Sequence, residues 1–315
     1  MIGAPGCRTI GLTVGLVVMA SCHSARAPIQ TVKTYESVAL VSPHSPAGWL
    51  TVVPLSDAPL TVGNGVTAHS AATRRLMIQS HETTQEQWTA VMGTNPSYFS
   101  DCGPQCPVER VSLWDAFVYL NARSTMEGLT ACYALSDCRG GGDGCPETWS
   151  HCEARTGCES VRFIGETCDG YRLPTKDEWL MIRDMANTMR TVTSYEDRHC
   201  AHNSRGRTRP VEHKGPGIDA LVGNVWEWIW EKHKDGSLAR GTHMGAGWAT
   251  SPRACTSMQT SHGQATLRAS FIGFRSVRSL PRNQSGAILF PKITWTQPRE
   301  YPRTAEVDHI FPDLK

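Results

Sequence analysis

Glu227 is the side chain whose surroundings most clearly suggest chemistry. It lies in the run Leu221–Glu231, which reads Leu-Val-Gly-Asn-Val-Trp-Glu-Trp-Ile-Trp-Glu. Alternate residues of a β-strand share a face, so the tryptophans would line one side and Glu227 would lie on the other. A carboxylate flanked by two tryptophans rarely stays unpaired. Either the protein satisfies Glu227 within a tryptophan-rich core strand, or Glu227 and nearby carbonyl groups hold Ca²⁺, which prefers oxygen ligands.

Cysteine is the second residue type that could carry chemistry, and the chain has 12 cysteines. Two of them fall in the N-terminal segment and leave an even number for the rest of the chain, which favours disulfides. Cys102 and Cys106 flank Gly-Pro-Gln and could close a tight loop. Cys200 and Cys255 lie apart from the other cysteines and could pair with each other.

Six cysteines crowd a glycine-rich segment, residues 132–168. They are Cys132, Cys138, Cys145, Cys152, Cys158 and Cys168. The segment has no apolar period and could not form a core of its own, so we interpret it as an insertion stapled by its own bridges. Zinc is the alternative, because clustered cysteines can make a tetrahedral site, but the spacing lacks two clean Cys-x-x-Cys pairs. The sequence does not determine how these cysteines are connected.

Three helices are predicted from capping boxes, in which a hydroxyl caps an early amide and an acidic residue three positions later reaches back. The pairs are Thr83 with Glu86, Ser112 with Asp115 and Thr175 with Glu178. Gly93 and Gly128 are expected to end the first two helices. Trp88, Trp114 and Trp179 fall on the apolar faces, and we interpret them as core residues rather than as a platform for a ligand.

Strands are predicted where β-branched residues gather between turn residues, at 49–54, 60–62 and 75–79. The predicted helices are short and few, and much of the remaining sequence is rich in turn residues. This combination predicts an α+β fold with much irregular structure, stapled by disulfides, with Glu227 on one of its strands.

The N-terminus is typical of an export signal. Arg8 precedes an apolar run, residues 10–20, that is too short to span a bilayer as a mature helix. The run ends in Met-Ala-Ser-Cys, which resembles a bacterial lipobox in which Cys22 is lipidated and becomes the first residue. The alternative is an ordinary signal peptide with an incidental cysteine. His23 stands where an aspartate would retain a lipoprotein at the inner membrane, which points to the outer membrane or periplasm of the cell envelope.

The predicted signal occupies residues 1–22. We expect the rest of the chain to divide into three parts. Residues 23–46, rich in Ser, Pro, Ala and Val, predict a flexible tether. Residues 47–282 would form the folded domain, and 283–315 a C-terminal extension. The formal net charge is +2 and no basic stripe is present, so a nucleic-acid partner is not expected. The expected partners are the membrane, through the lipid anchor, and a protein, peptide or glycan ligand.

Five stretches occur in the order typical of one family. They are Glu82–Trp88, Pro107–Ala116, Gly170–Trp179, Gly223–Trp228 and Ile272–Arg275. Together they resemble the formylglycine-generating enzyme family, also called the sulfatase-modifying factor family, over most of the predicted domain. The resemblance implies a single domain with a C-type-lectin-like α+β fold.

The resemblance also implies two Ca²⁺ sites. The second site of the family lies in the tryptophan stretch, and its ligands would be the carbonyls of Val222, Gly223 and Val225 and the carboxylate of Glu227. The first site would use an asparagine, for which Asn203 is the best match. Calcium is therefore the expected cofactor.

The active oxidases of this family bind Cu(I) through two cysteines spaced Cys-x-x-x-x-Cys. The two positions correspond to Pro252 and Ser257 in this chain. Copper is therefore not expected, because two soft thiolates make a site that oxygen ligands cannot make. Cys255 lies between the two positions. It could be a nucleophile or a lone metal ligand, or else a disulfide half or a buried thiol.

Two functions follow as hypotheses. The first is an exported, non-oxidase member of the family that acts as a Ca²⁺-stabilised binding or structural module. The alternative is an enzyme that modifies a peptide or small molecule without the copper-binding cysteine pair, as the pyoverdine-maturation relatives are thought to do. The sequence shows no Gly-x-Ser-x-Gly nucleophile elbow and no His-Glu-x-x-His zinc motif.

Overall fold

The structure is a computed structural model, and all the residues it describes fall within the predicted domain. The described residues are 49–52, 60–62, 66–68, 75–139, 145, 151–153, 157–188, 200, 204–211, 218, 221–231, 240–256 and 259–280. The predictions for residues 1–46, including the lipid site at Cys22, and for 283–315 lie outside the described residues. Asn203 and Ser257 lie outside them too.

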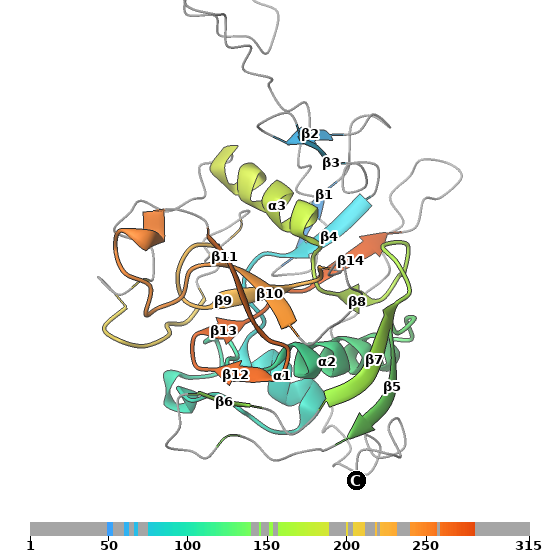
Figure 1. The fold of residues 1–315 in the computed structure, drawn as a ribbon, viewed down its shortest axis with the longest axis horizontal. Helices are drawn as coiled ribbons and strands as arrows, with labels where there is room; N and C mark the ends of the chain where they lie inside the picture. The colour runs from blue at the N-terminus through green and yellow to red at the C-terminus, as the bar shows by residue number, and fades with distance from the viewer. Residues whose placement is uncertain are drawn as a thin grey trace, which may run out of the picture. The chain divides into compact units, whose positions relative to one another are not determined.

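A four-stranded antiparallel sheet brings together distant parts of the domain sequence (Figure 1). Its strands are, in spatial order, β1 (Trp49–Val52), β4 (Arg75–Gln79), β14 (Val277–Leu280) and β8 (Tyr171–Arg172). The predicted strands near the start of the domain are confirmed as β1, β4 and β2 (Leu60–Val62), which pairs with β3 (Val66–Ala68).

The tryptophan stretch forms an inner strand of a second four-stranded sheet. The spatial order is β11 (Gln259–Gln264), β10 (Arg240–Gly245), β9 (Trp226–Ile229) and β13 (Ile272–Gly273). Strand β9 pairs antiparallel with β10 and parallel with β13. Trp228 packs in the larger apolar core, whereas Ile229 packs in a second core. The predicted alternation of faces along this strand is therefore confirmed.

The three predicted helices are present as α1 (Gln85–Met92), α2 (Leu113–Met126) and α3 (Lys176–Thr188). Two short 3₁₀ turns, η2 (Ser100–Cys102) and η4 (Ala254–Thr256), complete the described helical structure. Gly93 closes α1 with a left-handed φ of 74°. None of the described helices has both the length and the apolar character needed to cross a membrane.

The first capping box was predicted one residue too early. The cap of α1 is Thr84 with Gln87, not Thr83 with Glu86. Thr83 is still held in extended chain, because its N–H donates to the Phe274 carbonyl at 2.8 Å. The boxes predicted at Ser112 and Asp115, and at Thr175 and Glu178, are present as predicted.

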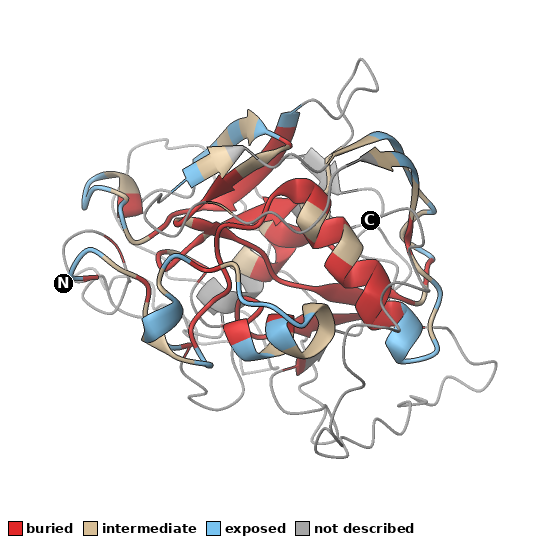
Figure 2. Cartoon of the chain, turned by 90° about the horizontal axis from the view of Figure 1, so that it is seen from below, coloured by how far each residue is buried: buried red, intermediate tan, exposed pale blue. Residues whose placement is uncertain are grey.

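Helices α2 and α3 supply much of the two cores, and Figure 2 shows buried residues concentrated along one long helix and the central strands. Trp114 and Phe117 of α2 pack in the larger core, while Trp179 and Ile182 of α3 pack in the second. Trp88 of α1 stacks on Tyr119 of α2 with ring centroids 5.1 Å apart. The three helix tryptophans are thus core residues, as predicted.

The cysteine-rich segment is stapled by three nested disulfides. They join Cys132 to Cys168, Cys138 to Cys158 and Cys145 to Cys152. The segment contributes a hairpin of β5 (Tyr133–Arg139) and β7 (Gly157–Phe163), and β6 (His151–Glu153), which pairs with β12 (Leu267–Ala269). All six cysteines are paired in these disulfides, so none presents a thiolate to zinc in this structure. The buried side chains at the base of the hairpin belong to the larger core of the domain.

Candidate functional site

Glu227 is held by side chains from two other predicted motifs. Arg275, two residues after the end of β13 in the sequence stretch Ile272–Arg275, donates from Nε to both carboxylate oxygens at 2.9 and 2.8 Å. Its Nη2 also donates to Oε1 at 2.6 Å. The indole Nε1 of Trp179, on α3, donates to Oε2 at 2.8 Å. Three stretches that were recognised separately in the sequence thus meet at one buried carboxylate, which is 1% exposed.

This arrangement tests how well Glu227 fits a Ca²⁺ site. An ionised carboxylate offers about four lone-pair positions. Arg275 and Trp179 together direct three N–H groups at its two oxygens, in four contacts because the Nε–H of Arg275 is shared between both. The guanidinium already neutralises the charge, so Glu227 as a Ca²⁺ ligand does not fit this geometry. Ca²⁺ binding by the carbonyls of Val222, Gly223 and Val225 stays a prediction.

An asparagine two residues before the tryptophan strand anchors a neighbouring loop. Asn224 is fully buried and adopts a left-handed φ of 58°. Its side-chain oxygen accepts from the Arg209 N–H at 3.0 Å, and its amide donates to the Arg209 carbonyl at 3.1 Å. Asparagine tolerates the left-handed region and can pair with a backbone in this way. It therefore ties the loop 204–211 to the start of β9.

The loop 204–211 is also fixed at its two ends. The Ser204 hydroxyl donates to the Trp248 carbonyl at 2.9 Å, and the Ser204 N–H donates to the Cys200 carbonyl at 2.8 Å. At the other end, the Val211 N–H donates to the Gln105 carbonyl at 2.9 Å. These contacts position the loop as a rigid wall rather than as a free connection.

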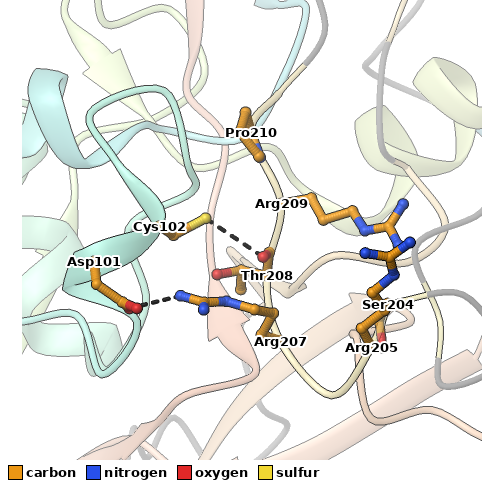
Figure 3. Close-up of a pocket in the computed structure, with 8 residues that line it drawn as sticks. All are labelled: Asp101, Cys102, Ser204, Arg205, Arg207, Thr208, Arg209 and Pro210. Atoms are coloured by element: carbon orange, nitrogen blue, oxygen red, sulfur yellow. Dashed lines mark hydrogen bonds and ion pairs between the residues drawn. The ribbon is translucent and has the colours of Figure 1, made fainter.

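This loop and the η2 turn line an open pocket of about 450 Å³. Its described lining consists of Asp101, Cys102, Ser204, Arg205, Arg207, Thr208, Arg209 and Pro210, shown in Figure 3. The volume lies in the range of small-ligand sites in proteins. Cys102 Sγ lies 3.4 Å from the Thr208 carbonyl oxygen, in contact across the pocket wall. That sulfur is in the disulfide with Cys106, so it has no proton to donate.

Arg207 connects the two walls of the pocket. Its Nη2 lies 2.6 Å from Asp101 Oδ1, and its guanidinium lies 5.5 Å from the centroid of the Phe99 ring. Phe99 in turn packs edge-on against Trp248 at 5.3 Å. In Figure 3 the Arg207 side chain points toward Asp101, while Arg205 and Arg209 extend from the other side of the loop.

A buried carboxyl group supports the same wall from behind. Glu109 accepts from the Phe99 N–H at 2.8 Å through Oε1 and is fully buried. Burial raises the pKa of the Glu109 carboxyl to about 8, although hydrogen bonds from the Phe99 and Tyr98 N–H groups and the charge of Arg110 oppose the rise. Glu109 thus holds the backbone of Phe99, the residue whose ring lies beside the Arg207 guanidinium.

Cys255 is bonded to Cys200 and is fully buried. The structure thus shows the disulfide among the alternatives considered for Cys255, and a disulfide sulfur is neither a thiolate nucleophile nor a thiolate metal ligand. Pro252, at one of the two positions that correspond to the copper cysteines, is exposed. The disulfide joins the stretch around Cys255 to the start of the loop 204–211.

The pocket was not singled out from the sequence. The signal that could have found it is the alternation of arginines at 205, 207 and 209, next to the predicted tryptophan strand. Nothing local in the sequence connects this run with Asp101, because the two segments lie about a hundred residues apart. The residues of the predicted motifs contact each other and do not line the pocket. They are Glu227, Arg275 and Trp179.

Comparison with known proteins identifies relatives of this chain. Residues 57–280 match the family model described as "Sulfatase-modifying factor enzyme 1-like domain". A protein of Paenibacillus barcinonensis, "Chaperone protein LppX", is 30% identical over a 206-residue alignment that covers 55% of this chain and 69% of the relative.

Two solved structures share the fold. "Treponema denticola variable protein 1" aligns with a TM-score of 0.51 and 21% identity, over 73% of this chain and 95% of its own. The structure titled "Crystal Structure of CarF" aligns with a TM-score of 0.52 and 21% identity, over 75% of this chain and 99% of its own. At this level of identity the similarity shows the fold alone, and it confirms the predicted α+β class.

Proposed function

The chain belongs to the family of sulfatase-modifying factor enzyme 1-like domains, and from this premise we propose that it is an exported binding module that does not use copper-thiolate chemistry. The proposed ligand is a protein or peptide. The proposed location is the cell envelope, with a lipid anchor at Cys22.

The observation that carries this proposal is the disulfide between Cys200 and Cys255. In the stretch that corresponds to the copper site of the active oxidases, Cys255 is buried in a bridge instead of presenting a thiolate. The bridge fixes the chain near Ser204, where the pocket wall begins. The local chemistry of this stretch thus favours a rigid surface for binding over a redox centre.

Five disulfides in the described residues support export. Disulfides form and persist in oxidising compartments and are rare in the reducing cytosol. The lipobox-like run ending at Cys22 supports a lipid anchor. The relative described as a chaperone protein supports a protein or peptide as the ligand.

A thiol and metal measurement on the natively exported protein tests the proposal. The protein is alkylated without reduction, digested and analysed by mass spectrometry, and copper is measured on the same sample. We expect Cys255 to remain unmodified and copper to be far below one equivalent. A freely alkylated Cys255 together with one equivalent of copper would overturn the proposal and point to an enzyme.

The anchor is tested separately. Incorporation of labelled fatty acid and the membrane fraction of the protein are compared between the natural chain and Cys22→Ser. We expect both signals to be lost in the variant. Equal labelling of the two proteins would remove the lipid anchor from the proposal and leave the binding role intact.

A further inference from the structure

We propose that the pocket between the η2 turn and the loop 204–211 binds an oxyanion, meaning a carboxylate or a phosphate group of a ligand. The first argument is charge. The described lining includes three arginines, Arg205, Arg207 and Arg209, and one acidic residue, Asp101, so it carries an excess of positive charge. Guanidinium groups donate hydrogen bonds and accept none. A ligand that complements this charge offers negatively charged acceptor atoms, and the fork of an arginine matches carboxylate and phosphate geometry.

The second argument is a buried hydroxyl without a partner. Thr208 lines the pocket and is 1% exposed. Its Oγ1 makes no hydrogen bond with any of the residues that the structure describes. A buried hydroxyl left unpaired costs about 1–3 kcal/mol, so such groups normally have a partner. A ligand oxygen that enters the pocket would accept this hydrogen bond.

The third argument is preorganisation. Arg207 is oriented by Asp101 and by the face of Phe99, and the backbone of Arg209 is clamped by Asn224. A loop held in this way loses little further freedom when a ligand binds, which improves affinity. The Asp101 and Arg207 side chains are 72% and 39% exposed, so their ion pair is weak and can be shared with an incoming anion.

Binding is measured by calorimetry on the exported full-length protein at constant ionic strength, because salt screens exposed charges. The probes are sodium phosphate and the peptide Glu-Glu-Glu-Glu, with Gln-Gln-Gln-Gln as the uncharged control. We expect the natural protein to bind at least one anionic probe and not the control peptide. No binding of either anion with a Kd below about 10 mM would overturn the proposal.

Three variants locate the binding. Arg205→Gln and Arg207→Gln are each expected to weaken binding of the anionic probe about tenfold, as for the loss of a charged hydrogen bond. Thr208→Val keeps the shape but removes the hydroxyl, and we expect it to weaken binding severalfold. Arg162→Gln, at an exposed arginine of β7 outside the pocket lining, is the matched control and should bind as the natural protein does.

Equal affinity in Arg205→Gln and Arg207→Gln, or an equal loss in Arg162→Gln, would show non-specific charge attraction and overturn the proposal. Arg205 is exposed, so its variant tests the pocket even where Thr208→Val disturbs folding. The choice of an acidic peptide rests on the proposed function. Binding of phosphate without the peptide would support the pocket while removing acidic peptides as its ligand, and tighter binding of the peptide would support both.

Discussion

Arg275 and Glu227 form a buried ion pair that connects the two four-stranded sheets of the domain. Glu227 lies on β9 of one sheet, and the Arg275 guanidinium also donates to the carbonyl of Gln79, at the end of β4 in the other sheet, at 3.2 Å. Both side chains of the pair are at most 1% exposed. The pair satisfies buried polar groups of three elements, β9, β4 and α3, because Trp179 of α3 also donates to Glu227. Breaking the pair should therefore lower the free energy of unfolding.

Glu227→Gln should lower the free energy of unfolding by about 3–5 kcal/mol, because it leaves the Arg275 charge buried without its counter-ion. Urea unfolding followed by tryptophan fluorescence measures this cost. Asp101→Asn is the control, since it breaks an ion pair whose carboxylate is 72% exposed, and it should cost less than about 1 kcal/mol. Similar costs for the two variants would contradict the central role of the Glu227 pair.

Calcium should not stabilise the protein through Glu227. A ligand at 100 times its Kd raises the free energy of unfolding by about 2.7 kcal/mol, which a thermal melt detects easily. Because Arg275 and Trp179 already direct three N–H groups at the Glu227 carboxylate, we expect any Ca²⁺-dependent shift between melts in EDTA and in millimolar Ca²⁺ to be as large in Glu227→Gln as in the natural protein. A Ca²⁺-dependent shift that disappears in Glu227→Gln would instead establish the calcium site implied by the family resemblance.

Glu109 should make the domain less stable as the pH rises. Its pKa rises from 4.5 to about 8 on folding, mainly through burial. Between these values the folded state binds one proton more than the unfolded state, so the free energy of unfolding falls as the pH increases and levels off above pH 8. Glu109→Gln should flatten this slope. Urea unfolding across this pH range checks it, and an unchanged slope in the variant would assign the effect to other groups.

Removing the Cys200–Cys255 bridge should cost more than removing the Cys102–Cys106 bridge. The first closes a loop with a sequence separation of 55 and the second one of 4. Loop-closure entropy then predicts losses of about 4 and about 2 kcal/mol for the two double Cys→Ala variants. Chemical unfolding of both variants gives the comparison. The reverse order would show that strain or residual structure in the unfolded chain outweighs loop entropy.

Gly273 lies in the motif that leads to Arg275, and it allows β13 to approach a neighbouring backbone. A Cβ at this position would lie 2.5 Å from the Val108 carbonyl oxygen and 3.0 Å from Val225 Cγ2. Gly273→Ala should therefore destabilise the fold by about 1–3 kcal/mol or more. Gly157→Ala is the control, since its Cβ would meet atoms no nearer than 3.7 Å, and it should change stability by less than about 0.5 kcal/mol. Equal thermal stabilities of the two variants would contradict the close approach at Gly273.

The sequence by itself determined the local structure of this domain. Capping boxes at Ser112 and Thr175 predicted two helices correctly, because a cap depends on residues three positions apart. The alternating tryptophans predicted the two faces of β9, because side chains alternate along a strand. Glycine 93 ended α1 as predicted, since it adopts the left-handed φ that closes a helix.

The tertiary structure decided the partners of these elements. Glu227 meets an arginine that is 48 residues away, and Arg207 meets a carboxylate that is 106 residues away. The cap of the first helix is Thr84 instead of Thr83 because the backbone of Thr83 pairs with Phe274. Such contacts depend on how the sheets and loops pack, and neither spacing nor local propensity encodes them. The same is true of the oxyanion pocket, which exists only where the loop 204–211 folds against the η2 turn.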